Sequence, residues 1–238
     1  MGVEAQGLDK RRASIQSMFN EVAPRYDLLN RLLSARRDVS WRRTAARSLD
    51  LPNNAHVLDL CCGTGDQAIA LHRQASRLVA ADFSLPMVGL AQGKFSALGE
   101  MQPSGLVADA LHLPLPERTF DAITVSFGLR NVENLKAALC EMLRVLKPDG
   151  RVVVLEFAVP ATALLRNLYL FYFRRILPRI GSLVSPRGSA YQYLTESVPS
   201  FPQRDRFTDH MIEAGFDRVG WRDLSGGIVC LYHGRRPT

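Results

Sequence analysis

Short apolar runs alternate along the chain with segments in which apolar residues recur every three or four positions. The apolar runs predict strands at residues 56–60, 77–83, 106–109, 120–127 and 151–157. The longer spacing predicts helices at residues 66–74, 85–98 and 135–146, and Pro148-Asp149-Gly150 predicts a turn before the strand at 151–157. Because strands that are apolar along their whole length need cover on both faces, this alternation predicts an α/β fold with a parallel sheet between two layers of helices.

The two ends of the chain depart from the alternation. Residues 1–50 have helical character and predict an N-terminal helical arm, which leaves residues 51–238 as the main domain. Residues 219–224 and 228–233 are typical of strands, and the Ser225-Gly226-Gly227 turn between them predicts an antiparallel hairpin at the sheet edge. With 238 residues, 47% of them hydrophobic, the chain is long enough for one full-size core.

A glycine-rich loop directly follows the first predicted strand. Its sequence, Gly63-Thr64-Gly65-Asp66-Gln67-Ala68, fits the G-x-G-x-x-G/A pattern of nucleotide-binding loops. Asp66 enters the next helix, where its carboxylate would repel the diphosphate of a nicotinamide or flavin cofactor. S-adenosylmethionine (SAM) has no phosphate and carries a sulfonium cation, and SAM methyltransferases of this architecture share the C-terminal hairpin. The sequence therefore predicts a class I SAM-dependent methyltransferase, Rossmann-like, with a mostly parallel seven-stranded sheet.

The ends of the other predicted strands carry polar residues that fit the same ligand. Asp82 closes the second strand, at the distance from the loop where an acid binds ribose hydroxyls; its alternative role is a helix cap, which Ser84 could equally perform. Asp109 and Ala110 follow the third strand, where an acid can accept a hydrogen bond from the adenine amino group; Asp109 is otherwise a turn residue. Ser126 ends the fourth strand, and we expect it to point toward the cofactor.

The composition limits where in the cell the protein is expected but does not identify a binding partner. The net charge of +7 suits nucleic acid, an anionic membrane surface, or solvated faces without a partner. The richest apolar stretch, residues 164–177, is interrupted by arginines and is shorter than the roughly 20 residues that a membrane span needs. Four cysteines lack zinc-site spacing and the polar start lacks the core of a secretory signal, so we expect a cytoplasmic protein without a metal.

Several longer motifs make the chain resemble the quinone-biosynthesis C-methyltransferases, which methylate demethylmenaquinol and, in some members, a polyprenyl methoxybenzoquinol. The motifs are Tyr26-Asp27-Leu28-Leu29-Asn30 with Leu33-Ser34 and Trp41, Ser126-Phe127-Gly128-Leu129-Arg130-Asn131-Val132, and Leu177-Pro178-Arg179-Ile180-Gly181-Ser182-Leu183. The likeness covers nearly the whole chain, residues 17–233. Two positions depart from the pattern: Asp38 stands where the family usually has histidine, and Asp149 replaces a glycine of a Lys-Pro-Gly-Gly turn.

The resemblance implies that five residues contact SAM, namely Thr64, Asp82, Asp109, Ala110 and Ser126. It also implies that the acceptor is a prenylated quinol, with demethylmenaquinol, in the last step of menaquinone biosynthesis, as the first expectation. Methoxybenzoquinol of ubiquinone biosynthesis and demethylphylloquinol are alternatives, and so is a non-catalytic SAM-binding protein. A nucleic-acid methyltransferase is disfavoured, because the motif typical of base amino methylation has prolines where this chain reads Ser126-Phe127-Gly128.

The candidate catalytic residue is Arg130. A quinol carbon becomes nucleophilic when the neighbouring hydroxyl ionises, and a fixed cation lowers the pKa of that phenol; the alternative role of Arg130 is an ion pair with Glu133 or Glu156. Tyr26 and Asn30, with Arg130, are the expected substrate-binding residues, although Tyr26 and Asn30 could instead belong to packing of the arm. Residues 164–177, in an insertion at about 160–200, suit a lid over the prenyl tail or a helix on anionic lipid. The ring system and any homo-oligomeric state stay open.

Overall fold

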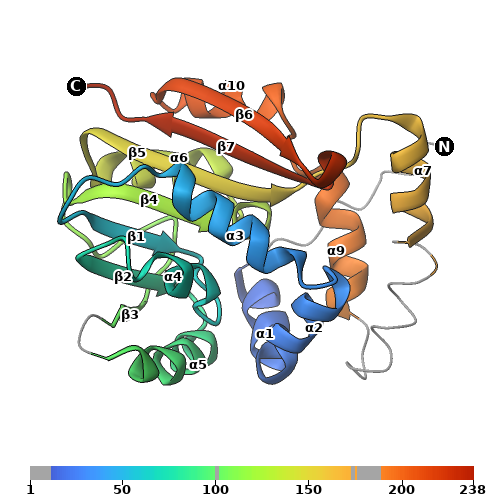
Figure 1. Cartoon of the computed structure of the whole chain (residues 1–238), viewed down its shortest axis with the longest axis horizontal. Helices are drawn as coiled ribbons and strands as arrows, with labels where there is room; N and C mark the ends of the chain where they lie inside the picture. The colour runs from blue at the N-terminus through green and yellow to red at the C-terminus, as the bar shows by residue number, and fades with distance from the viewer. Residues whose placement is uncertain (1–11, 100–101, 173–174, 176–188) are drawn as a thin grey trace.

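A computed structural model describes residues 12–99, 102–172, 175 and 189–238 (Figure 1). In this part of the chain seven strands form one sheet in the order β3-β2-β1-β4-β5-β7-β6. Their bounds are β1 (His56–Leu60), β2 (Arg77–Asp82), β3 (Ser104–Val107), β4 (Phe120–Ser126), β5 (Leu146–Phe157), β6 (Asp217–Leu224) and β7 (Val229–Arg235). The first five strands are parallel, and β7 is antiparallel to both β5 and β6. The predicted class I methyltransferase fold is confirmed.

The strand order reverses at β1, which lies between β2 and β4. Leu60 at the end of β1 pairs in register with Ala81 of β2 and Val125 of β4. The carboxyl ends of these strands are therefore level, so the glycine loop, Asp82 and Ser126 leave the sheet at the same edge. In open parallel sheets this reversal point is where ligands bind.

Helices cover both faces of the sheet, as the alternation predicted. They are α1 (Arg12–Val22), α2 (Tyr26–Leu33), α3 (Arg37–Ser48), α4 (Asp66–Leu71), α5 (Leu85–Phe95), α6 (Leu135–Val145), α7 (Ala163–Phe171), α9 (Ser189–Ser200) and α10 (Asp205–Glu213). One core cluster joins the sheet to α6 and α10, and the other joins it to α3, α4 and α5. Helices α1, α2 and α9 gather beyond the carboxyl ends of β1 and β4 (Figure 1).

Some strand boundaries differ from the predicted ones. The third strand is Ser104–Val107 rather than residues 106–109, so Asp109 lies in the following turn. β5 begins at Leu146 and runs through the predicted Pro148-Asp149-Gly150 turn, because the backbone around Asp149 pairs with Arg236. The hairpin is confirmed, but only β6 lies at the sheet edge, since β7 is enclosed between β5 and β6.

The structure describes parts of the predicted N-terminal arm and of the predicted insertion at 160–200. Helices α1 to α3 occupy the predicted arm, and α7 and α9 lie within the predicted insertion at 160–200; the division at residue 50 stays a prediction. Residues 173–174 and 176–188, which include the Leu177-Pro178 motif, lie outside the described residues. Among the described residues, no helix combines the length and the apolar character needed to cross a membrane.

Candidate functional site

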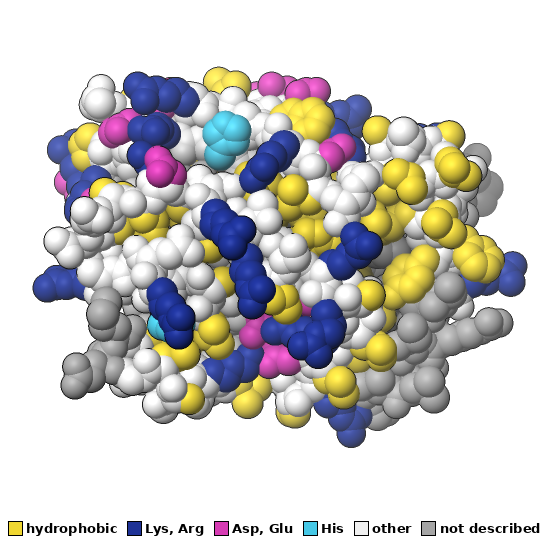
Figure 2. Space-filling view, viewed as in Figure 1, with side chains coloured by type: hydrophobic (Ala, Val, Ile, Leu, Met, Phe, Trp, Pro, Cys, Tyr) yellow, Lys and Arg dark blue, Asp and Glu magenta, His cyan; other side chains and the backbone are white. Residues whose placement is uncertain are grey.

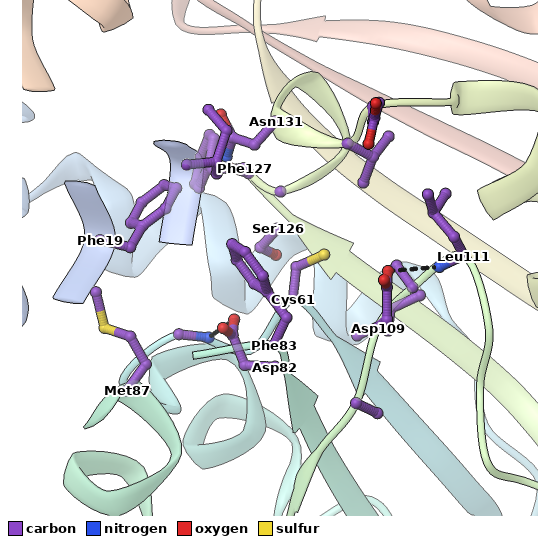
Figure 3. Close-up of a pocket in the computed structure, with 18 of the residues that line it drawn as sticks. Phe19, Cys61, Asp82, Phe83, Met87, Asp109, Leu111, Ser126, Phe127 and Asn131 are labelled. Carbon is purple, nitrogen blue, oxygen red and sulfur yellow. Dashed lines mark hydrogen bonds between the residues drawn. The ribbon is translucent and has the colours of Figure 1, made fainter. Parts of the chain in front are cut away.

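A cleft of about 800 Å³ opens at the carboxyl ends of β1, β2 and β4 (Figure 3). Its lining includes Gly63, Asp82, Asp109, Ala110 and Ser126. Phe83, Met87 and Leu111 supply apolar walls. Five of the seven predicted cofactor-binding residues therefore share one cleft.

The glycine loop takes a backbone course that other residues rarely adopt. Gly63 and Gly65 have φ angles of +54° and +85°, in the left-handed region that glycine enters without strain. A Cβ atom on Gly65 would also lie 2.6 Å from the Phe95 ring of α5. Gly65 and Thr64 do not line the cleft; they form the turn that shapes it, and their contact with SAM stays a prediction.

Asp82 ties the end of β2 to this loop. Its carboxylate accepts hydrogen bonds from the N–H groups of Gly63, at 2.9 Å, and Ser84, at 3.0 Å. Burial raises the pKa of Asp82, and these backbone N–H groups counteract the rise. The capping role falls to Ser84, whose hydroxyl accepts from the N–H of Met87 at the start of α5. Each Asp82 oxygen keeps acceptor capacity for a ligand hydroxyl.

The other two polar strand ends also have hydrogen-bond partners within the protein. Asp109 accepts a hydrogen bond from the N–H of Leu111 at 3.0 Å, as the turn alternative expects, while its side chain still lines the cleft. The Ser126 hydroxyl donates to the side-chain oxygen of Gln67 on α4 at 3.0 Å. Both residues thus have a structural partner and a place in the cleft wall.

The charges in the cleft suit a cationic ligand. Its described lining contains the acids Asp82, Asp109 and Glu133 and neither lysine nor arginine. A diphosphate would meet repulsion there, whereas a sulfonium cation would be attracted. Asp66, on which the sequence argument relied, lies elsewhere and is ion-paired with Arg31 at 2.8 Å and Lys94 at 2.9 Å. The preference for SAM therefore rests on the three acids that line the cleft.

A second, larger pocket of about 1230 Å³ adjoins the first. The two pockets share three wall residues, Phe19, Tyr26 and Phe127. The second pocket is predominantly apolar, with contributions from α1, α2, α3, α7 and α9. It brings the three predicted substrate-binding residues together, because Tyr26, Asn30 and Arg130 all line it. An apolar acceptor placed there would lie beside the cofactor cleft.

Comparison with known proteins identifies the family. The ubiE/COQ5 methyltransferase family matches residues 6–236. The chain belongs to this family. It is 43% identical, over 97% of its length and 96% of the relative's, to a demethylmenaquinone methyltransferase of Mycobacterium marinum. It is 42% identical to the ubiquinone/menaquinone biosynthesis C-methyltransferase UbiE of Geobacter sulfurreducens, over 96% of the chain and 91% of that protein.

The fold is also shared with solved methyltransferases of low sequence identity. One is a SAM-dependent methyltransferase of Thermotoga maritima, a possible histamine N-methyltransferase. Its TM-score is 0.65, with 20% identity, and the match covers 93% of this chain and 99% of that one. At such identity the likeness concerns the fold alone. Family membership makes this ubiE/COQ5 protein a SAM-dependent methyltransferase and confirms the resemblance seen in its sequence motifs.

Arg130 is held in a buried ion pair. Its Nη1 lies 3.0 Å from Oε2 of Glu156, which is fully buried, and it also donates to the backbone carbonyl of Phe127. Burial raises the pKa of Glu156, and the Arg130 charge counteracts that rise. Of the two carboxylates considered as partners, Glu156 is therefore the one used, whereas Glu133 lines the cofactor cleft. The ion pair and the place in the pocket wall coexist, and the catalytic role stays a prediction.

Other residues of the second pocket give no separate sequence signal. Phe127 and Phe157 stack with ring centroids 4.5 Å apart, and Trp41 meets both rings edge-on. Arg42 on α3 and Tyr193 on α9 also line this pocket. The sequence marks Trp41 only as part of a family motif, because aromatic residues at such spacings usually belong to an ordinary core.

An ion-pair network fastens α2 over the glycine loop. Asp66 is paired with Arg31 and Lys94, and Asp27 of α2 contacts both Lys94 and the hydroxyl of Thr64. Burial would raise the pKa of Asp66, but Lys94 and the neighbouring arginines outweigh it and lower that pKa. Asp38, at the position where the family usually has histidine, continues this network by pairing with Arg31.

Proposed function

We propose that this methyltransferase transfers the methyl group of SAM to a ring carbon of demethylmenaquinol and forms menaquinol, the last step of menaquinone biosynthesis. The observation that carries the proposal is the large apolar pocket that shares Phe19, Tyr26 and Phe127 with the acidic cofactor cleft. The relative from Mycobacterium marinum, named for this substrate, supports it.

We assign the cofactor contacts to the strand ends. Asp82 binds the ribose hydroxyls, Asp109 with Ala110 receives the adenine amino group, and Ser126 lies beside the methionine part. Gly63, Thr64 and Gly65 let the loop backbone approach the cofactor. When bound, SAM supplies an electrophilic methyl that bonds to the attacking carbon as its bond to sulfur breaks, leaving S-adenosylhomocysteine.

The protein's task is alignment of the acceptor and help with its ionisation. The quinol hydroxyl beside the reacting carbon loses its proton to solvent, and its electrons make that carbon nucleophilic. Tyr26 and Asn30 position the ring, while Arg130 stabilises the developing phenolate. After the new carbon–carbon bond has formed, the ring carbon releases its proton and the ring regains aromaticity.

The prenyl tail would leave the pocket between α2 and α7. The inner residues of these helices, Leu29 and Tyr169, pack together. The two helices also expose six large apolar side chains, namely Leu28, Leu32, Leu164, Leu165, Leu168 and Phe171. Figure 2 shows apolar side chains gathered over α7 at the right of this face and basic side chains spread over α3. We propose that this surface rests on an anionic membrane from which the quinol enters.

Vesicle binding tests the membrane contact. We expect co-sedimentation with vesicles containing anionic lipid, and weaker binding as salt rises because surface attraction is screened beyond roughly 10 Å at 0.1 M. Leu164→Ser with Leu168→Ser should reduce binding. The matched control is Leu85→Ser, which changes an equally exposed leucine on α5. Equal binding of wild type to neutral and anionic vesicles, or equal effects of the control, would refute the proposal.

An acceptor assay tests the reaction itself. Purified protein with SAM is supplied with demethylmenaquinol and, separately, with a polyprenyl methoxybenzoquinol, and the methylated products are identified by mass spectrometry. We expect methylation of demethylmenaquinol. The name of the Geobacter sulfurreducens relative covers both quinone pathways, so methoxybenzoquinol is the second candidate acceptor. Turnover of neither quinol, by protein that binds SAM, would refute the proposed function.

A further inference from the structure

Arg42 lies in the wall of the acceptor pocket, next to the boundary with the cofactor cleft. It follows Trp41 on α3, and only 7% of its surface is exposed. Its guanidinium carbon lies 5.2 Å from the ring centroid of Phe127, the residue that both pockets share. Arg42 thus places a positive charge close to where the reacting ring must lie.

Apart from the Phe127 ring, the charge of Arg42 has no hydrogen-bonding or oppositely charged partner in direct contact within the described structure. Its side chain makes neither a hydrogen bond nor an ion pair there, and its Nε is buried without an acceptor. The other buried pocket arginine, Arg130, differs because Glu156 neutralises it. Arg31 on α2 is likewise paired, with Asp38 and Asp66.

The acids that influence Arg42 from farther away do not compensate it. Asp66 already has two cationic partners, Arg31 and Lys94. Asp59 is fully buried on β1, and burial raises its pKa to about 8, so it is largely protonated at neutral pH. A buried cation is costly unless a negative group accompanies it. Since the described residues supply none in contact, a bound anionic ligand is the natural partner.

We propose that Arg42 is a second catalytic residue, which contacts the ionised oxygen of the bound quinol and supplies the net positive charge that stabilises it. This inference rests on the proposed quinol methylation. The Arg130–Glu156 pair has no net charge and therefore attracts a phenolate less strongly than an unpaired guanidinium does. Arg42 and Arg130 lie over the two members of one aromatic stack, Phe127 and Phe157. A flat quinol beside this stack has an arginine available to it at each ring.

Variants of α3 test this role in single-turnover methyl transfer from SAM to demethylmenaquinol. Arg42→Met keeps the length of the side chain and removes its charge. We expect the rate at pH 7 to fall by roughly a hundredfold, the usual effect of losing one electrostatic stabiliser. The residual rate should rise with pH, because the solvent then ionises the quinol. Arg42→Lys should recover part of the rate, and Arg43→Met, the exposed neighbour, should behave like wild type.

Two further measurements separate this role from alternatives. SAM affinity, measured by calorimetry, should change less than about twofold in Arg42→Met; a tenfold loss would assign Arg42 to the cofactor and overturn the proposal. If Arg42 merely balances Asp59, adding Asp59→Asn to Arg42→Met should restore the rate, and that rescue would also overturn it. Should Arg42→Met fail to fold by circular dichroism, the pH profiles of Arg42→Gln and Arg42→Lys decide instead, and parallel profiles would refute the role.

The outcome for wild type keeps the two proposals apart. If wild type methylates demethylmenaquinol and Arg42→Met does so equally fast, only the role of Arg42 fails. If wild type binds SAM and methylates no quinol, the proposed function fails, and the role of Arg42 fails with it.

Discussion

Asp82→Ala is the sharpest test of the cofactor cleft. Asp82 accepts backbone hydrogen bonds from Gly63 and Ser84 and, in the proposed complex, also binds the ribose hydroxyls. A hydrogen bond to a charged group contributes about 1.5–3 kcal/mol, and about 1.4 kcal/mol corresponds to a tenfold change in affinity. Losing the ribose contact should therefore weaken SAM binding roughly tenfold to a hundredfold. Two N–H groups also lose their acceptor, so we expect a loss of stability of about 2 kcal/mol or more.

The assay pairs calorimetric titration of SAM with thermal unfolding. Asp121→Ala is a matched control, because Asp121 also accepts a backbone N–H, that of His56 at 2.8 Å, but at the opposite end of the sheet. The control should lose stability and keep its SAM affinity. If Asp82→Ala is folded and binds SAM within twofold of wild type, or if both variants lose affinity equally, the assignment of Asp82 to the ribose is wrong.

Three further outcomes follow from the ionisable side chains in and around the site. Arg130→Leu should cut the methyl-transfer rate about a hundredfold and leave SAM affinity nearly intact. Arg130→Lys should retain more of the rate than Arg130→Leu does, whereas loss of SAM affinity in Arg130→Leu would indicate a scaffold residue. The pKa of Asp59, raised to about 8, makes the folded state retain a proton that the unfolded state releases near pH 4, so stability falls as pH rises between these values. Asp59→Asn should therefore stabilise the protein more at pH 8 than at pH 5, and an equal gain in chemical denaturation at both would contradict this. Lys94→Ala, which removes one cationic partner of Asp66 and Asp27, should increase the rate of hydrogen exchange in α2. Unchanged exchange there would show that the ion-pair network does not fasten α2.

The parts of the site that the sequence predicted lie at strand ends. Gly63, Asp82 and Ser126 each follow an apolar run, and parallel pairing necessarily brings the ends of those runs to one edge. The same argument reached Asp109 although the third strand was placed two residues too late. The error in the strand boundary did not affect the predicted position of Asp109. In the turn after β3, the Asp109 carboxylate accepts a hydrogen bond from the N–H of Leu111 and lines the cleft.

Local signals were insufficient where distant residues decide the structure. The Pro148-Asp149-Gly150 turn was expected to end before a strand, yet β5 includes it because Arg236 pairs with the backbone of Asp149 and Gly150. A partner nearly ninety positions away leaves no trace in the local spacing, so tertiary pairing overrides the turn preference. Asp66 shows the same limit for charges, since its partners Arg31 and Lys94 come from two other helices.

Arg42 and Arg43 show most clearly why a charge count could not identify the acceptor site. They are adjacent and identical in the sequence, yet Arg42 is buried beside Phe127 and Arg43 is exposed. An exposed arginine contributes to the net charge of +7 at little electrostatic cost, because water solvates it. A buried one requires a counter-charge, and Arg130 finds it in Glu156 whereas Arg42 finds none in contact among the described residues. The chemically informative cation is therefore the one whose charge the fold leaves unbalanced, and only the packing of α3 against the pocket reveals it.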